Sequence, residues 1–293
     1  MIEIFAPTGV GEVGAGTDLA ALVVAAVNAD PAGPLRAGDV VVVTSKIISK
    51  AEALVRSAAD RAAVIEEQTE RTVARRGPTA IVRTHHGLTL AAAGVDNSNV
   101  APGTVLVLPP DPDASAAALH EGLTRRTGLP LAVVVSDTAG RAWRIGQTDQ
   151  AIGAAGLRVV ERYAGQRDGY GNDLQVTARA VADEIAGAAD LVKAKLAGRP
   201  VAVVRGLADL VQPVDRPDGR AADLIRETGQ DMFGRGAREA VLLAALAATG
   251  RAERYEELVG LAEPERTEAV LDGAGLAPEA AALLRAVLAA DLT

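Results

Sequence analysis

The chain of 293 residues has no cysteine, only three histidines and few aromatic residues, which make up 2% of the sequence. Without cysteine there is no disulfide, no thiolate nucleophile and no zinc–thiolate site. With only three histidines, two of them adjacent at His85 and His86, a metal site built from histidines is not expected. Any metal is expected to be a hard cation held by oxygen ligands. The shortage of aromatic side chains argues against a stacking surface for single-stranded nucleic acid.

Long apolar runs and an excess of positive charge are also missing. No apolar segment reaches the roughly 20 residues that span a bilayer. The N-terminal residues MIEIFAP lack the basic and apolar regions of a signal peptide. The formal net charge of −8 argues against non-specific nucleic-acid binding, which needs a basic surface. We therefore expect a cytoplasmic protein that binds neither nucleic acid nor a membrane.

The pattern of apolar residues, which with Tyr and Trp make up 49% of the chain, predicts a mixed fold. β-Branched or alternating runs predict strands, and a period of 3.6 residues predicts helices. Closely spaced strands between residues 79 and 109 favour antiparallel pairing, so we predict an α+β (mixed α/β) fold with a large antiparallel component. The predicted strands are residues 1–6, 40–44, 79–84, 87–94, 104–109, 131–137 and 200–206, with an extended segment at 45–55. The predicted helices are residues 19–29, 58–76, 113–127 and about 176–196, and only helices follow from 236 onward.

A glycine-rich loop lies between the first predicted strand and the first predicted helix. Residues Gly9–Gly14 match the dinucleotide-binding pattern G-x-G-x-x-G. That pattern also needs an acidic residue at the end of the second strand to hold the ribose, but this strand ends in Thr44-Ser45-Lys46. The loop therefore has two interpretations: backbone amides that approach a phosphate or ribose, and a structural turn.

Two further segments leave apolar strands and enter acidic loops. Asp96 and Asn99 come from the first, and Asp137, Thr138, Arg141 and Arg144 come from the second. Two carboxylates, a hydroxyl and two guanidiniums at strand ends suit metal-assisted phosphoryl chemistry. Each acid alone could cap a turn, but together they favour a site. The residues SDTAG at 136–140 look like an element of small GTPases, yet the chain has no G-x-x-x-x-G-K-[ST] phosphate loop.

Longer blocks of sequence resemble one family, coenzyme F-420:L-glutamate ligase, also called gamma-glutamyl ligase. The resemblance runs in collinear order from residue 2 to residue 233. It is carried by TSKIISKAE (44–52), HGLTLAAAGVDNSN (86–99), SDTAGRAWRIGQTDQAIGAAG (136–156) and the run from DGYGNDL (168–174) through VADEIAGAADLVKAKL (181–196) to PVAVVRG (200–206).

The resemblance implies a GTP-dependent enzyme that ligates L-glutamate to the lactyl carboxylate of a deazaflavin phosphodiester, coenzyme F-420-0. The reaction would pass through an acyl phosphate and give GDP and phosphate, with further gamma-linked additions as an open extension. Two divalent cations (Mg²⁺ or Mn²⁺) and an intertwined homodimer are also implied. We expect a ligase domain at residues 1–235 and a helical extension at 236–293. The extension is too short for the nitroreductase-like domain of longer relatives, so no flavin is expected.

The resemblance also implies roles for particular residues. Asp96 and Asp137 resemble ligands of one metal, and Thr138 resembles a ligand of the second, with Asp218 as the candidate to complete it. The residues that resemble GTP contacts are Pro7, Thr8, Gly9, Val10, Ser45, Lys50 and Asn99, and the catalytic set is Asp96, Asp137, Lys50, Arg141 and Arg144. Two alternatives stay open: an NAD(P)-dependent oxidoreductase that uses the Gly9–Gly14 loop, and a non-catalytic module that binds a nucleotide or deazaflavin.

Overall fold

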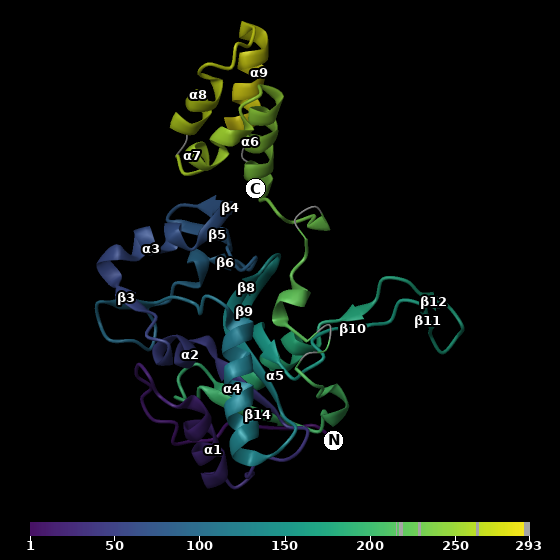
Figure 1. Ribbon diagram of the computed structural model, residues 1–293. Helices are drawn as coiled ribbons and strands as arrows, with labels where there is room; N and C mark the ends of the chain where they lie inside the picture. The colour runs from purple at the N-terminus through teal and green to yellow at the C-terminus, as the bar shows by residue number, and fades with distance from the viewer. Residues whose placement is uncertain (215, 217–218, 228–229, 262–263, 290–293) are drawn as a thin grey trace. The chain divides into compact units, whose positions relative to one another are not determined.

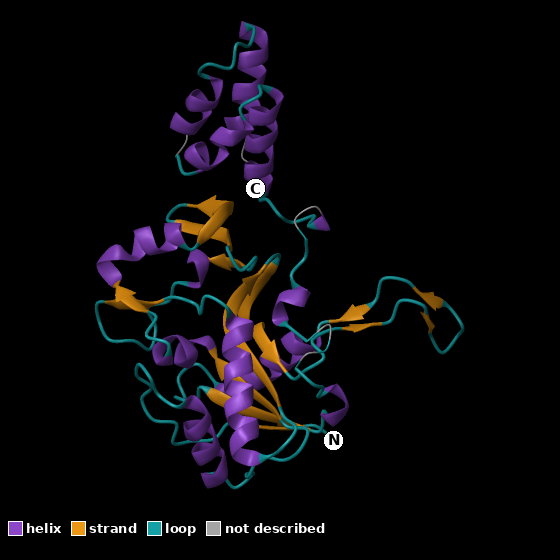
Figure 2. Cartoon of the chain, viewed as in Figure 1, coloured by secondary structure: helices purple, strands orange, loops and turns teal. Residues whose placement is uncertain are grey.

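The computed structural model describes residues 1–214, 216, 219–227, 230–261 and 264–289. The fold is mixed α/β, as predicted, and it divides into two compact units (Figure 2). The first unit comprises Met1–Val64 and Gly94–Ile225, and the second comprises Ile65–Ala93 and Arg226–Thr293. The sequence predicts one boundary at residue 235. In the structure, the second unit also contains the segment Ile65–Ala93 from the first half of the chain.

A five-stranded sheet forms the centre of the first unit (Figure 1). Its strands, in spatial order, are β1 (Glu3–Phe5), β14 (Val201–Arg205), β2 (Val40–Thr44), β8 (Ala132–Arg141) and β9 (Arg144–Ala155). β2 and β8 are parallel, and all other neighbours are antiparallel. The valines of β2 have no exposed surface, as is typical of a β-branched strand that is covered on both faces.

Helices α1 (Leu19–Ala29), α2 (Ser45–Ala51), α4 (Pro112–Thr127) and α5 (Val181–Lys193) complete the core of the first unit. Helix α1 begins where predicted, because the Asp18 carboxylate accepts a hydrogen bond from the Ala21 N–H at 2.9 Å. Helix α4 is capped in the same way by Asp111 and ends at the left-handed Gly128. α4 packs against β8 and β9, and α5 packs against β9, β14 and β1.

Shorter elements surround this core. β3 (Val55–Ser57) pairs with β7 (Thr104–Leu106), and an extended arm carries two small ribbons (Figure 1). The ribbons are β10 (Glu161–Arg162) with β13 (Ala178–Arg179), and β11 (Gln166–Arg167) with β12 (Asp173–Leu174). The 3₁₀ turns include η1 (Ala58–Asp60), η2 (Ala92–Gly94), η3 (Ala208–Leu210), η4 (Ala221–Leu224) and η6 (Ala252–Arg254).

The second unit joins a three-stranded antiparallel sheet to the C-terminal helices. The sheet contains β4 (Thr69–Arg76), β5 (Thr79–Thr84) and β6 (Thr89–Ala91), and the helices are α6 (Ala237–Ala248), α7 (Tyr255–Val259), α8 (Glu265–Leu271) and α9 (Pro278–Ala289). Helix α3 (Arg61–Glu67) spans the boundary between the units. The helices form their own apolar core.

Carboxylates from these helices bind the outer edge of β4. The Arg75 N–H donates to Glu239 at 3.0 Å, and the Thr72 N–H donates to Glu256 at 3.2 Å. The Tyr255 hydroxyl donates to the Thr72 carbonyl at 2.9 Å. Backbone groups on a sheet edge need partners, and here the C-terminal helices supply them. In the part of the chain that is described, no helix has the length and apolar character needed to cross a membrane.

Four sequence-based assignments were wrong in part. Residues 45–51 form helix α2 rather than an extended segment. Of the predicted 58–76 helix, 58–60 form the 3₁₀ turn η1 and 61–67 form α3, whereas 69–76 pair with β5 as β4. The helix expected at 176–196 covers only α5, since Val176 and Leu196 are both more than 90% exposed. Residues 144–155, expected to be a loop, form β9. For β4 and β9, pairing with another strand overrides the local pattern.

Candidate active site

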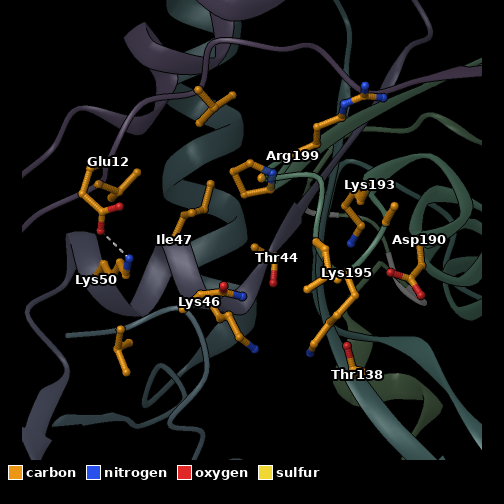
Figure 3. Close-up of a pocket in the computed structure, with 18 of the residues that line it drawn as sticks. Glu12, Thr44, Lys46, Ile47, Lys50, Thr138, Asp190, Lys193, Lys195 and Arg199 are labelled. Carbon is orange, nitrogen blue, oxygen red and sulfur yellow. Dashed lines mark hydrogen bonds and ion pairs between the residues drawn. The ribbon is translucent and has the colours of Figure 1, made fainter. Parts of the chain in front are cut away.

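A pocket of about 770 Å³ opens in the first unit. One side is formed by the Gly-rich loop at Val10–Val13 and by α2, and the other side by the loop that follows α5 (Figure 3). The segment after Asp96 and the paired strands β8 and β9 complete the wall. Figure 3 shows Lys50 facing Glu12 on one side, and Lys193 and Lys195 on the other.

A change of register in the β8–β9 hairpin places polar side chains at this wall. Val133, Val134 and Val135 are buried apolar residues, but the register shifts between Val135 and Ser136, and the residues that follow are polar. The Asp183 carboxylate of α5 accepts a hydrogen bond from the Ala151 N–H, beside this irregularity, at 2.9 Å. Because a bulge re-aims the side chains around it, the end of β8 can supply a site instead of core.

Asp137 lies on the side of β8 that faces α2. The hydroxyl of Ser45 donates a hydrogen bond to its carboxylate at 2.8 Å. Burial raises the pKa of Asp137 above its ordinary value, although the nearby charge of Lys46 and the hydrogen bond from Ser45 act in the opposite direction. The charge of Asp96 adds to the increase, so the two predicted carboxylates are electrostatic neighbours.

Asp96 is paired with a lysine. The ammonium of Lys46 lies 2.5 Å from its Oδ2, and Ser98 donates to it through both its N–H, at 2.7 Å, and its hydroxyl, at 2.9 Å. Burial alone would raise the pKa of Asp96, but the bonds from Lys46 and Ser98 outweigh it and hold the pKa below its ordinary value. Lys46 therefore supplies positive charge to both carboxylates.

Thr138 and Asp149 lie on the opposite side of β8 from Asp137. The Thr138 hydroxyl donates to Asp149 at 2.8 Å, and the ammonium of Lys193 lies 2.6 Å from the same carboxylate. Burial alone would raise the pKa of Asp149, but the charge and hydrogen bond of Lys193, with the hydroxyls of Ser136 and Thr138, hold it below its ordinary value. This carboxylate is therefore ionised at neutral pH.

The positively charged side chains of the pocket differ in whether a carboxylate lies within ion-pair distance. Lys50 lies 2.5 Å from Glu12, whose side chain is 84% exposed. Lys195 and Arg199, on the loop after α5, also line the pocket, and no carboxylate of the described residues lies within ion-pair distance of either. Lys195 points toward the side of the pocket where Thr138 lies (Figure 3). These two charges are available to an anionic ligand.

The structure brings together some of the predicted residues and not others. The pocket is lined by Val10, Lys50, Asn99 and Thr138. Asp96 forms an ion pair with the lining residue Lys46, and the charge of Lys46 also acts on Asp137, to which Ser45 is hydrogen-bonded. Pro7, Thr8 and Gly9 precede the lining part of the Gly-rich loop. Asp218 lies outside the described residues.

Arg141 and Arg144 are not among the residues that line the pocket. The two arginines are paired across the end of the β8–β9 hairpin, and both are exposed. Arg141 is four residues beyond Asp137 on one strand, about 13 Å at 3.3 Å per residue. Their separation from the pocket follows from β9, which the sequence analysis treated as a loop.

Sequence reasoning missed Asp149, Asp190, Lys193, Lys195 and Arg199, all of which line the pocket. Asp149 lies in a segment expected to be a loop, and the other four lie at the end of α5 or just beyond it. A helical pattern predicted through residue 196 hid the turn at Ala194, whose φ of 49° is left-handed. That conformation is uncommon for a residue other than glycine, so the sequence carried no signal for it.

The Gly9–Gly14 loop is not in a dinucleotide-binding unit. Such a unit has two parallel strands joined by a helix in one sheet. Here β1 is antiparallel to β14, and β14 separates it from β2. Helix α1 also begins five residues after Gly14, at Leu19. The geometry therefore does not support the oxidoreductase alternative.

The family model described as F420-0:Gamma-glutamyl ligase matches residues 9–206. The chain belongs to this family. All residues that line the pocket, from Val10 to Pro200, lie within the matched range. The resemblance found in the sequence is thus confirmed.

Curated members of the F420-0:gamma-glutamyl ligase family are similar over most of their length. The coenzyme F420:L-glutamate ligase of Methanothermobacter thermautotrophicus is 37% identical over 256 residues, which cover 79% of this chain and 98% of that protein. The protein of the same name from Halorubrum lacusprofundi is 39% identical over 231 residues (70% and 87%). That from Methanopyrus kandleri is 35% identical over 239 residues (74% and 92%).

The residues of this family member fit hard divalent cations that are held jointly with a ligand. Asp96 and Asp137 offer carboxylate oxygens on one side of β8, and Thr138 offers a hydroxyl on the other side. Among the described residues, no three or more His, Asp or Glu side chains are arranged to hold a metal by themselves. Mg²⁺ is commonly bound by one or two carboxylates together with substrate phosphates and water, so this incomplete donor set suits a cation that arrives with a phosphate.

The raised pKa of Asp137 predicts that Asp137→Asn stabilises this ligase-family protein at neutral pH in EDTA. A carboxyl whose folded pKa is raised destabilises the fold once it ionises; the penalty appears as pH rises from 3.8 through the folded pKa and is absent at lower pH. Asparagine keeps the shape and still accepts from Ser45. We expect Asp137→Asn to unfold at a higher denaturant concentration than native protein near neutral pH, with the difference shrinking as the pH falls, measured by denaturant unfolding between pH 4 and 8. The exposed Asp209→Asn is the control; a neutral-pH loss in Asp137→Asn would contradict the assignment.

Proposed function

We propose that the protein ligates L-glutamate to the lactyl carboxylate of coenzyme F-420-0, using GTP and a divalent cation (Mg²⁺ or Mn²⁺). The observation that carries this proposal is the placement of two coupled carboxylates, Asp96 and Asp137, beside Lys46 at the wall of a cation-lined pocket in a chain of this family. The proposed products are the glutamyl amide, GDP and phosphate.

The chemistry explains why such a pocket is needed. A carboxylate is a poor acyl donor at neutral pH, and its activation as an acyl phosphate brings its negative charge against a triphosphate. Cations that line the pocket offset this repulsion, and a fixed arrangement of the reactants lowers the barrier further. Glutamate then attacks through its amine and phosphate leaves, so no side-chain nucleophile is needed in a chain without cysteine.

Each proposed role rests on a position in the structure. Asp96, Asp137 and Thr138 would hold the divalent cations, which when bound neutralise phosphate charge and polarise the phosphoryl group. Lys50 would bind a phosphate as a point charge. The loop at Val10–Val13 would approach the nucleotide through its backbone, with Asn99 as a further contact.

We also propose that the protein is a cytoplasmic homodimer. Large apolar side chains are exposed at the end of the β8–β9 hairpin and on the arm: Trp143 is 82% exposed, Ile145 102%, Tyr170 96% and Val176 93%. Exposed apolar surface on projecting hairpins favours contact with another chain. Static light scattering should give twice the mass of 29.9 kDa; a monomer at micromolar concentration would contradict this part of the proposal.

One assay tests the proposed reaction. The protein is mixed with GTP, Mg²⁺ or Mn²⁺, L-glutamate and the deazaflavin substrate, and the products are examined for GDP and for the added glutamyl mass. We expect both with the native protein and at least a 100-fold loss of turnover in Asp137→Asn, since the carboxylate charge is lost. Release of GDP by Asp137→Asn at the native rate would refute the role of this residue, and tight binding without turnover in the native protein would favour a binding module.

Substitutions at Lys50 and Glu12 test the phosphate contact. Lys50→Met should raise the KM for GTP by about tenfold or more, because a hydrogen bond to a charged group contributes about 1.5–3 kcal/mol. Glu12→Gln is the matched control: it removes only the exposed partner of Lys50, and such pairs contribute about 0–1 kcal/mol. We expect it to change the KM by less than about fivefold. Equal KM values for native protein and Lys50→Met would contradict the contact.

A further inference from the structure

A buried ion pair forms part of the pocket wall, and the roles proposed above include neither of its residues. Asp149 of β9 is 4% exposed and Lys193, the last residue of α5, is 5% exposed. Their charged atoms are 2.6 Å apart. A buried charge pair is often no more stabilising than apolar residues of similar volume. Its position against the pocket therefore invites a functional explanation.

Hydrogen bonds engage both oxygens of the Asp149 carboxylate. Lys193 donates to the Ser136 hydroxyl at 2.7 Å, and Ser136 donates to Asp149 Oδ2 at 2.8 Å. The other oxygen, Oδ1, accepts from the Thr138 hydroxyl at 2.8 Å. Thr138 and Asp149 are directly opposed across the β8–β9 ladder, so strand pairing fixes the distance between them.

The geometry assigns the single proton of the Thr138 hydroxyl to Asp149. The hydroxyl donates to Oδ1 at 2.8 Å, while the Lys193 ammonium and the Ser136 hydroxyl donate to Oδ2 at 2.6 and 2.8 Å. A hydroxyl has one donor and two acceptor lone pairs, so its donor is committed to Asp149. Both lone pairs of that hydroxyl oxygen are then free to face the pocket that Thr138 lines. An oxygen presented in this way suits a hard cation.

We propose that Asp149 is a positioning residue that orients the Thr138 hydroxyl as an acceptor toward a divalent cation, and that Lys193 holds the Asp149 carboxylate in place. The inference rests on the proposed function, because it assumes that the cation binds with a nucleotide. Outer partners of metal ligands fix ligand orientation, and their loss typically weakens metal affinity or activity by about 10–100-fold.

Binding of Mn²⁺ in the presence of GDP, followed by electron paramagnetic resonance, tests this role without turnover. We expect Asp149→Asn to weaken Mn²⁺ binding by about tenfold or more, and Thr138→Val to weaken it similarly. Thr138→Ser, which keeps the hydroxyl, should bind within about threefold of native protein. In the double variant Asp149→Asn/Thr138→Val, the Asp149 substitution should add nothing further, because residues that act through one group are not additive.

Two controls separate positioning from stability. Ser136→Ala removes a hydrogen bond from the same carboxylate on the side away from Thr138, so it should lower the melting temperature but leave Mn²⁺ affinity within about threefold. If Asp149→Asn does not fold because it leaves Lys193 unpaired, Asp149→Asn/Lys193→Met removes both charges and takes its place.

The outcomes distinguish this inference from the proposed function. If the native protein binds no Mn²⁺ with GDP, both fail. If native protein binds Mn²⁺ and Asp149→Asn binds it equally well, only the positioning role fails. It also fails if the Asp149 substitution weakens binding by the same factor with and without Thr138→Val, since its effect would then not pass through the threonine.

Discussion

The parallel pairing of β2 with β8 is the constraint on which the candidate site depends. Thr44 is opposite Ser136 in this ladder, so the next residues lie side by side: Ser45, where the chain leaves the sheet as α2, bonds at 2.8 Å to Asp137, where β8 continues. Parallel strands end at the same edge, where α/β proteins commonly bind ligands. Because α2 starts at Ser45, the same pairing also brings Lys46 and Lys50 to the pocket.

Strand β8 then separates two carboxylates with opposite behaviour. Asp137, on the α2 side, has a raised pKa because burial outweighs its partners, whereas Asp149, on the α5 side, has a lowered pKa because Lys193 and two hydroxyls outweigh burial. The partners of Asp137 do not offset the cost of burying its charge, so this carboxylate suits an incoming cation. The partners of Asp149 do offset that cost, so this carboxylate suits a fixed support. Environments that push pKa values apart are typical of functional sites.

The sequence allowed correct prediction where the signal is local. Asp18 caps α1 at the predicted start, and the all-β-branched run at Val40–Thr44 is a buried strand. Asp96 and Asp137 could be singled out as candidates because acids that follow apolar runs are conspicuous in a sequence. Lys193 and Asp149 were not, because they are 44 residues apart and acquire meaning only when α5 packs on β9. Likewise, 144–155 is a strand only because β8 pairs with it.

The carboxylates that bind the edge of β4 affect how the protein can be shortened. Glu239 and Glu256 occupy backbone N–H groups of an edge strand, and such groups, when left open, can recruit a strand from another molecule. A fragment that stops before α6 would keep the whole pocket, since its lining residues end at Pro200, but it would bare that edge. Poor solubility of such a fragment would then reflect intermolecular strand pairing and would say nothing about catalysis.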